Sequence, residues 1–455
     1  MTDQPVAQSY VDVAEHGLSR AVAEERVRRP IVGVPRATAE VPLPRAKERG
    51  RTLSFLASLD KVVIGVVAML LAIGLMMVYS TTFDWSYQDY GNEAVIFMQH
   101  VRNVLIGLAV MAVTALIDHR IWKRFAILVL IVTFALLIGV LLFGDNTFGA
   151  RRAFFQGSYQ PGEMAELTII IYLSAWLGTK SSHIRSFSHG LLPFSVLVGG
   201  MAWLVMLQPD ISTAAMIVLV SGLLFFLAGA SWTQIGVAAA VIAIASMMLL
   251  SSDNLRYAQN RVETYISGAS DLTQANYHVQ QAVIAFINGG WTGVGLGQGK
   301  QKFGFLPAPH TDSIFAVIGE ELGFVGALVV VALYVVLIFR GFQISRRSPD
   351  MFGALLAAGI TIWIAAKALL NIAVMTAVLP ATGAPLPFIS FGGSSLVVLL
   401  AGAGLLLSVA RANARHRGPD WRNYRAIVDR SGGNRGRSIS RIGRSRSDSK
   451  PSTRH

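Results

Sequence analysis

One segment of the sequence combines acidic, basic and glycine residues in a way that suits the binding of a phosphate group. It reads GGWTGVGLGQGKQKFGFLPAPHTD and ends at Asp312, with Lys300, Lys302 and His310 ahead of the carboxylate. A carboxylate can serve as a general base, and lysines in a glycine-rich loop suit a phosphate or diphosphate. A nucleotide loop is excluded, because the Walker pattern requires Ser or Thr where Gln301 stands. Plain packing of the loop is the alternative interpretation.

Asp312 stands where a long apolar segment begins, so capping of a helix is the alternative to catalysis. Glu320 and Glu321 follow inside that segment, and Lys367 lies inside a later one. Ionisable residues within membrane segments are costly and are functional candidates by default. The alternative for the two glutamates is a structural ion pair between one of them and Lys367.

Further charged residues lie in loops that we predict to be on the same side of the membrane as the glycine-rich segment. They are Arg151 and Arg152 in GARR, Glu163 in QPGE, Asp210 in QPD, and Arg256 and Arg261 in a long loop. Guanidinium groups match phosphate oxygens, so the arginines are candidates for holding a diphosphate. For Arg151 and Arg152, pairing with Glu163 or with a lipid headgroup is the alternative. For Asp210, the alternative is helix capping.

The stretch LPATGAPLPFISFGGSS contains Ser394 and Ser395 and precedes the last apolar segment. Its first five residues mimic a sortase sorting signal, but the tail beyond is far longer than a disposable anchor needs. The prolines and glycines predict a re-entrant, non-helical stretch, which is tolerated at membrane depth only if it is buried in protein or lines a cavity.

Long apolar segments must position these residues. The chain of 455 residues has 14% charged residues and a mean hydropathy of +0.52, whereas soluble domains have roughly 25% charged residues. We therefore predict an all-α polytopic membrane protein. Ten spans are expected, at residues 62–80, 103–117, 125–143, 162–178, 191–207, 211–229, 233–250, 313–339, 353–378 and 395–410.

The distribution of charge predicts the orientation. The net charge of +13 belongs mostly to the ends, since residues 1–61 carry +2, residues 411–455 carry +10, and the rest carry +1. Both termini are therefore predicted to be cytoplasmic. Residues 1–58 and 412–455 are expected to be disordered tails around a membrane domain at 59–411. The basic tail is expected to contact anionic lipid, and no nucleic acid is expected.

The loops that carry the chemistry then face outward. The longest, residues 251–312, lies between the seventh and eighth spans and is expected to be the catalytic loop. Residues 277–286 within it have apolar positions at helical spacing. The sequence has no cysteine, which excludes disulfides and thiolate chemistry.

These motifs, taken in order, resemble the SEDS family (shape, elongation, division and sporulation) over residues 58–412. The resemblance rests on GARR…QPGE, QPD, VGLGQGKQKFGFLPAPHTDSIFAVIGEELG and NIAVMTAVLPATGAPLPFISFGGSSL. Within the family, QKFGFLP…HTD…FAVIGEELG is more similar to FtsW and SpoVE than to RodA, so the FtsW type is favoured.

The resemblance implies a glycosyltransferase that polymerises lipid II into β-1,4 glycan strands at the outer face of the bacterial cytoplasmic membrane during cell division. It implies Asp312 as the essential carboxylate, with a class B penicillin-binding transpeptidase and other division membrane proteins as partners. A RodA-type elongation polymerase and a lipid II flippase are the alternatives. The sequence has no closed metal site, so Mg²⁺ or Mn²⁺ would be held mostly by the substrate diphosphate.

The sequence departs from the family pattern at two charged positions. Glu166 stands where the family usually has Lys, and Lys367 stands where Gln is expected. An exchanged ion pair between Lys367 and Glu166 would explain both departures, provided that the two side chains lie within about 10 Å of each other.

Overall fold

The structure is a computed structural model, and its described residues all belong to one compact unit, Ser54–His455; the other unit is Met1–Leu53. The expected tails lie outside the described residues, except for residues 412–416 of the C-terminal tail. Most of residues 251–275 also lie outside the described residues. Described are residues 59–147, 150–154, 159–179, 184–250, 264–265, 267 and 276–416.

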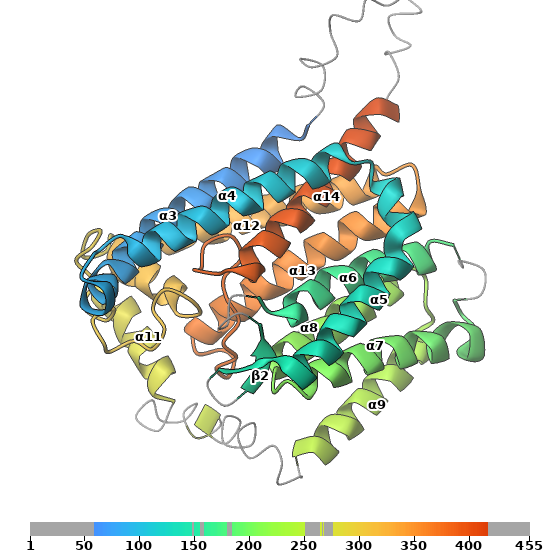
Figure 1. Ribbon diagram of the computed structural model, residues 1–455, viewed down its shortest axis with the longest axis horizontal. Coiled ribbons are helices and arrows are strands. Elements are labelled where there is room, and N and C mark those ends of the chain that lie inside the picture. Colours follow the sequence, from blue (N-terminus) through green and yellow to red (C-terminus); the bar gives the residue numbers. More distant parts are fainter. Residues whose placement is uncertain are drawn as a thin grey trace, which may run out of the picture. The chain divides into compact units, whose positions relative to one another are not determined.

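The described part is nearly all helical, as predicted (Figure 1). The ten expected spans correspond to α3 (Lys61–Tyr90), α4 (Val95–Leu116), α5 (His119–Phe143), α6 (Pro161–Leu177), α7 (Leu192–Met206), α8 (Ile211–Leu227), α9 (Trp232–Leu250), α12 (Ile314–Arg346), α13 (Met351–Met375) and α14 (Ser394–His416). A short π-helix, η3 (Phe187–Leu191), precedes α7, and α11 (Tyr277–Gly289) confirms the helical spacing found in the long loop. By length and composition, seven of the described helices can cross a membrane, and α8 and part of α9 are shorter apolar helices.

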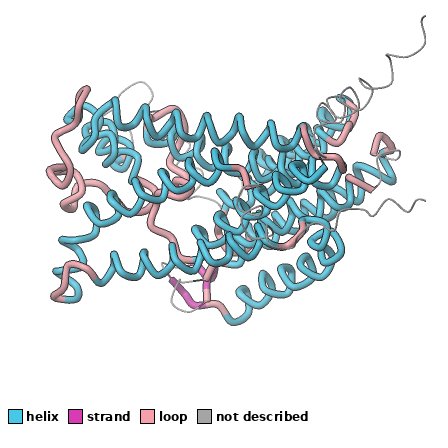
Figure 2. Tube along the Cα trace, turned by 90° about the horizontal axis from the view of Figure 1, so that it is seen from above, coloured by secondary structure: helices cyan, strands magenta, loops and turns pink. Residues whose placement is uncertain are grey.

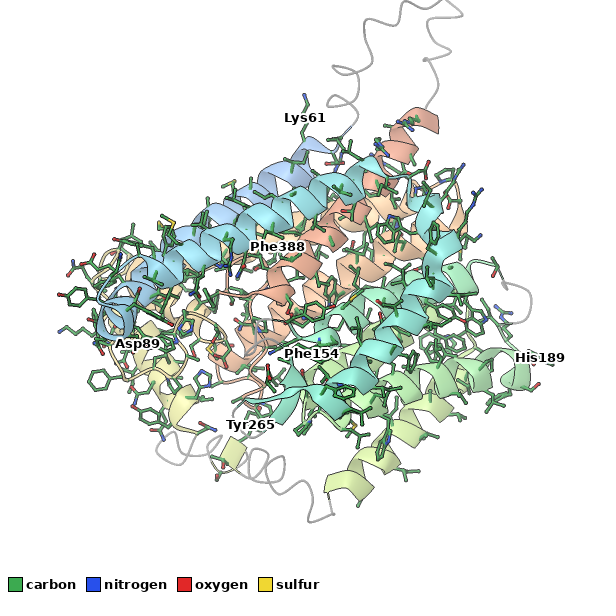
Figure 3. All side chains as sticks on the ribbon, in the orientation of Figure 1. Lys61, Asp89, Phe154, His189, Tyr265 and Phe388 are labelled. Atoms are coloured by element: carbon green, nitrogen blue, oxygen red, sulfur yellow. The ribbon has the colours of Figure 1, made fainter. Side chains whose placement is uncertain are left out.

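Two features depart from the expected helix pattern. The GARR segment forms an antiparallel hairpin of β1 (Asp145–Thr147) and β2 (Ala150–Ala153), drawn in magenta on the flank of the helices in Figure 2. Helix α3 continues past the expected end at residue 80 to Tyr90, because its polar last turns still form a regular helix capped by Gly91 in the left-handed conformation. Figure 3 labels Lys61 and Asp89 at opposite ends of this helix.

Aspartates begin several helices by accepting hydrogen bonds from the first free backbone N–H groups. Asp60 accepts from Val62 and Val63 at the start of α3. Asp118, Asp210 and Asp350 play the same part at α5, α8 and α13. Local sequence therefore fixes where these helices start.

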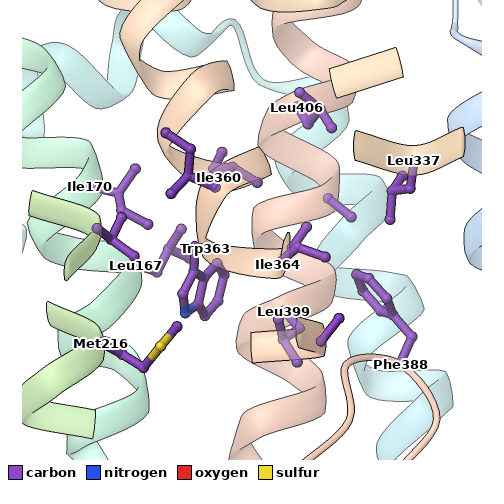
Figure 4. Close-up of a cluster of buried hydrophobic side chains, with 14 of the residues drawn as sticks. Leu167, Ile170, Met216, Leu337, Ile360, Trp363, Ile364, Phe388, Leu399 and Leu406 are labelled. Atoms are coloured by element: carbon purple, nitrogen blue, oxygen red, sulfur yellow. The ribbon is translucent and has the colours of Figure 1, made fainter. Parts of the chain in front are cut away.

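The centre of the helical unit is an apolar cluster around Trp363 of α13 (Figure 4). Leucine, isoleucine and methionine side chains from α6, α8, α12 and α14 surround it, namely Leu167, Ile170, Met216, Leu337, Leu399 and Leu406. Helices approach closely at glycines, since a Cβ on Gly402 would lie 3.0 Å from the Trp363 ring.

One end of the unit is basic and held by ion pairs and caps between helices. The Arg340 guanidinium lies 2.9 Å from the Asp60 carboxylate, and His119 lies 3.2 Å from Asp350. Arg411 of α14 donates to the Leu116 carbonyl at 2.7 Å. These three contacts link α3 to α12, α5 to α13, and α14 to α4 at this end of the unit.

Candidate active site

A cavity of about 1200 Å³, here called the chamber, lies among α3, α6, α8, α13 and the loops before α12 and α14. It brings together most of the predicted site residues that the structure describes. The chamber lining includes Glu163, Asp210, Lys302, His310, Asp312, Lys367, Ser394 and Ser395.

Asp312 is partly exposed and faces the chamber. Helix capping does not explain it, because the N-cap of α12 is Ser313. Among the described residues, the only hydrogen bond to its carboxylate comes from Thr311 Oγ1, at 3.2 Å. Its backbone carbonyl accepts from Asn371 Nδ2 at 2.7 Å, which holds the residue in place. The carboxylate is thus anchored through its main chain and remains available to a substrate.

The stretch between α13 and α14 is non-helical, as predicted, and it lines the chamber beside Asp312. Its residues 386–390 are buried, whereas Val378 and Leu379 near its start are exposed. Asn371 Nδ2 bridges to the Ala384 carbonyl at 2.8 Å, and Ser390 Oγ donates to the Thr311 carbonyl at 2.5 Å. The Phe391 N–H donates to the His310 carbonyl at 2.8 Å. These bonds satisfy backbone groups of both loops and fix the wall that faces Asp312.

Lys367 pairs with Glu166, and the distance between Nζ and Oε2 is 2.6 Å. Both side chains are at most 5% exposed, and Trp363 Nε1 donates to the same glutamate at 2.9 Å. The exchanged ion pair expected from the sequence is confirmed. The alternative pairing of Lys367 with Glu320 or Glu321 is wrong, because those two glutamates bind the glycine-rich loop instead.

The glycine-rich loop is held by what we call the brace, formed by Glu320, Glu321, Lys302 and Ser80. Glu320 accepts the backbone N–H groups of Lys300 and Gln301, and Glu321 accepts that of Gly297. Lys302 Nζ donates to Glu321, Ser80 Oγ and the Gly297 carbonyl, at 2.8 to 2.9 Å. Lys302 lines the chamber, but these three bonds engage its ammonium group, so its place is in the brace rather than on a diphosphate.

Three glycines of this loop, at positions 289, 293 and 299, are explained by packing against α12, and those at 290, 295, 297 and 304 by a positive φ. A Cβ on Gly289 would collide with the Gly319 carbonyl, and one on Gly293 with the Glu321 carbonyl. Helix α12 itself is broken at Gly323, whose φ is 71°. The loop supplies the hydrogen bonds that the helix lacks at this break. The N–H groups of Val294 and Gly295 donate to the carbonyls of Glu320 and Glu321, and the Phe324 N–H donates to the Gly290 carbonyl.

His310 is buried against aromatic rings rather than against charges. Its ring centroid lies 4.8 Å from that of Trp85 and 5.6 Å from that of Phe391. Burial lowers the pKa of His310 from 6.5 to about 4. The imidazole is therefore neutral at physiological pH and does not supply a cation for a diphosphate.

The remaining basic candidates lie elsewhere. Lys300 is exposed and is not part of the chamber lining. Arg151 and Arg152 lie in β2, opposite β1, but their side chains are outside the described part. Arg256 and Arg261 lie outside the described residues. The described lining therefore carries five carboxylates, from Asp84, Glu163, Glu166, Asp210 and Asp312, against the ammonium groups of Lys302 and Lys367.

Sequence reasoning missed four residues that build this site. Asn371 positions Asp312, and its only sequence signal is a polar amide inside an apolar span. Asp84, Trp85 and Gln88 line the chamber from the last turns of α3. They were missed because the span was expected to end at residue 80, although the helical spacing of these three positions could have indicated a common face.

Comparison with known sequences gives one consistent family. A family model described as "Cell cycle protein", covering FtsW, RodA and SpoVE, matches residues 60–415. Stage V sporulation protein E of Bacillus subtilis is 34% identical over 360 residues, which is 77% of this chain and 97% of that protein. A probable peptidoglycan glycosyltransferase FtsW of Trichlorobacter lovleyi is 33% identical over 359 residues, covering 78% and 94%.

Solved structures agree with the fold. A chain of a peptidoglycan synthase complex matches with a TM-score of 0.64 and 25% identity, covering 78% of this chain and 98% of that one. The rod shape determining protein RodA of Thermus thermophilus matches with a TM-score of 0.58 and 24% identity, covering 80% and 98%. The latter likeness concerns the fold alone.

Proposed function

The chain belongs to the FtsW, RodA and SpoVE family of cell cycle proteins, and we propose that it polymerises lipid II into β-1,4 glycan strands for the septum. Membership makes it an integral membrane protein and a peptidoglycan glycosyltransferase, the activity for which several relatives are named. The FtsW and sporulation relatives among its matches support a role in division over one in elongation.

The observation that carries the proposal is the available Asp312 carboxylate in the wall of a chamber large enough for a disaccharide. In the proposed reaction, Asp312 takes the proton from the 4-hydroxyl of the acceptor sugar as its oxygen attacks C1 of the donor. The bond between C1 and the diphosphate oxygen breaks, and the lipid diphosphate leaves. A single displacement from an α-linked donor inverts C1 and gives a β-1,4 link.

The leaving diphosphate needs positive charge, which the described lining does not offer in unpaired form. We propose that Arg151, Arg152, Arg256 and Arg261 supply part of it. Among the described residues, no three histidine or acidic side chains lie close enough together to hold a metal ion alone. A Mg²⁺ or Mn²⁺ ion would therefore be bound by the diphosphate and one or two chamber carboxylates.

Topology and partners follow from the same proposal. The end bearing Arg340, Arg346 and Arg411 faces the cytoplasm, where basic loops and the tail contact anionic lipid. The chamber then opens toward the extracytoplasmic side of the bacterial cytoplasmic membrane. The likeness to a chain of a peptidoglycan synthase complex supports a class B penicillin-binding transpeptidase as partner, together with other division membrane proteins.

The test is polymerisation of lipid II by the purified protein in nanodiscs, with and without the transpeptidase. We expect Asp312→Asn to lower the rate about 1000-fold, the range for loss of a general base. Asp89→Asn, an exposed aspartate of α3 outside the chamber, is the control and should keep the wild-type rate. Equal polymer from Asp312→Asn would refute the assignment of the base, and transbilayer movement without polymer would favour a flippase.

A further inference from the structure

The last turns of α3 present one polar and aromatic face to the chamber. Thr81, Asp84, Trp85 and Gln88 line it, and their spacing of three and four residues places them on one side of the helix. Tyr87 of the same turns is 59% exposed and does not line the chamber. Tyr87 therefore suits the interfacial belt that Trp and Tyr form in membrane proteins, whereas Trp85 exposes its ring to the cavity.

Trp85 is both exposed and held in place. It is 45% exposed, while its ring centroid lies 4.8 Å from that of His310. His310 is backed by Phe391 at 5.6 Å, and Phe391 by the fully buried His100 at 5.5 Å. This row of rings joins α3, the loop before α12, the stretch before α14, and α4. An exposed indole with such support is a rigid flat surface.

Hydrogen-bonding groups lie beside that surface. Gln88 Nε2 donates to Asp84 Oδ2 at 2.8 Å, which orders both side chains one turn apart. The pair still presents an amide oxygen, a second amide N–H and a second carboxylate oxygen. Sugars offer the matching chemistry, because a pyranose has an apolar face of C–H groups and a rim of hydroxyls that both donate and accept.

We infer that this α3 face is a saccharide subsite, in which Trp85 stacks on a sugar ring of the lipid-linked substrate and Asp84 and Gln88 bind its hydroxyls. The inference rests on the proposed function and names the part of the substrate bound there. C–H groups of the sugar meet the negative face of the indole. Because His310 is two residues from Asp312, the subsite holds the sugar beside the carboxylate that takes its proton.

The test compares Trp85→Ala, Trp85→Phe and Tyr87→Ala as lipid II polymerases. Loss of stacking should raise KM about tenfold in Trp85→Ala and leave kcat within about twofold. Trp85→Phe keeps a ring and should recover part of the affinity. Tyr87→Ala removes an exposed aromatic residue from the same turns and should match the wild type. A wild-type KM in Trp85→Ala, or a loss confined to kcat, would overturn the subsite.

A soluble probe separates this inference from the proposed function. Saturation-transfer NMR with the disaccharide of N-acetylglucosamine and N-acetylmuramic acid should show binding to the wild type and to Tyr87→Ala, and much weaker binding to Trp85→Ala. If the wild type binds the disaccharide but makes no polymer, the proposed function fails and the subsite stands. If the wild type polymerises lipid II but disaccharide binding is unaffected by Trp85→Ala, the subsite fails alone.

A second variant covers the case in which Trp85→Ala does not fold. Gln88→Ala removes the amide that we place on the sugar hydroxyls and leaves the row of rings intact. It should also weaken disaccharide binding and raise KM in the same assays. Wild-type values for both measurements in Gln88→Ala would overturn the subsite.

Discussion

Two buried lysine–glutamate pairs lie in the described part of this protein and differ in how completely their polar atoms are hydrogen-bonded. Lys302 and Glu321 are 2.8 Å apart and Lys367 and Glu166 are 2.6 Å apart, and all four side chains are at most 5% exposed. Around Glu321, Ser80 and the Gly297 N–H supply further hydrogen bonds. Glu166 instead keeps one buried oxygen, Oε1, for which the described residues offer no partner.

Burial and pairing alone therefore do not identify a functional charge. The first pair joins α3, α12 and the glycine-rich loop in a network whose charged groups are all hydrogen-bonded. Such a network has a structural role. The second lies between α6 and α13 in the chamber wall, where Glu163 and Asp210 are also found. Its unpartnered oxygen leaves the hydrogen bonding of this second pair incomplete among the described residues.

The largest effect should come from breaking the first pair. Lys302→Met leaves Glu321 buried without its cation, and such a break costs about 3 to 5 kcal/mol of folding free energy. Thermal unfolding and hydrogen exchange of residues 297–306 should show the loss, and polymerisation should fall because the loop leads to Asp312. The exposed Lys300→Met is the control, since only its backbone N–H serves Glu320. Wild-type protection of the loop in Lys302→Met would contradict the brace.

Exchanging the charges sharpens the contrast between the pairs. Lys367→Glu alone should be inactive. Adding Glu166→Lys should restore activity to within about tenfold, because the ion pair is formed again and the Trp363 hydrogen bond that is lost is worth about 1 kcal/mol. The same exchange at Lys302 and Glu321 should not recover, since an ammonium group cannot accept from Gly297 and Ser80. The measurement is the polymerisation rate of both double variants. Equal recovery of activity in the two would contradict the proposed difference between the pairs.

The smallest effect concerns His310, a buried titratable group with aromatic neighbours in place of a charged partner. Burial lowers its pKa to about 4, so between pH 4 and 6.5 the unfolded chain binds a proton that the folded chain does not. Folding stability should therefore fall as the pH drops through this window, by about 2 kcal/mol at pH 5. His310→Phe should lose this part of the pH dependence in thermal unfolding. An unchanged profile would show that the imidazole is not buried as a neutral group.

Sequence alone predicted the ten apolar helices and most of the charged residues that line the chamber, because long apolar runs and charged residues in loops are local signals. It also predicted the Lys367–Glu166 pair, from two departures that compensate each other. It could not predict that Glu320 and Glu321 bind the loop, since that depends on how the loop folds back at the Gly323 break. The polar turns of α3 were missed for a similar reason: their meaning comes from contacts with residues more than 200 positions later.

The break at Gly323 limits how the length of the glycine-rich loop can change. Four backbone groups freed by the break are satisfied by residues 290–295, so this loop takes the place of a missing helical turn. Without this segment, these four backbone groups would lose their hydrogen-bond partners. Loops usually accept insertions, but an added residue here would shift the register of these hydrogen bonds. The segment therefore has a fixed length, set by the helical turn that it replaces.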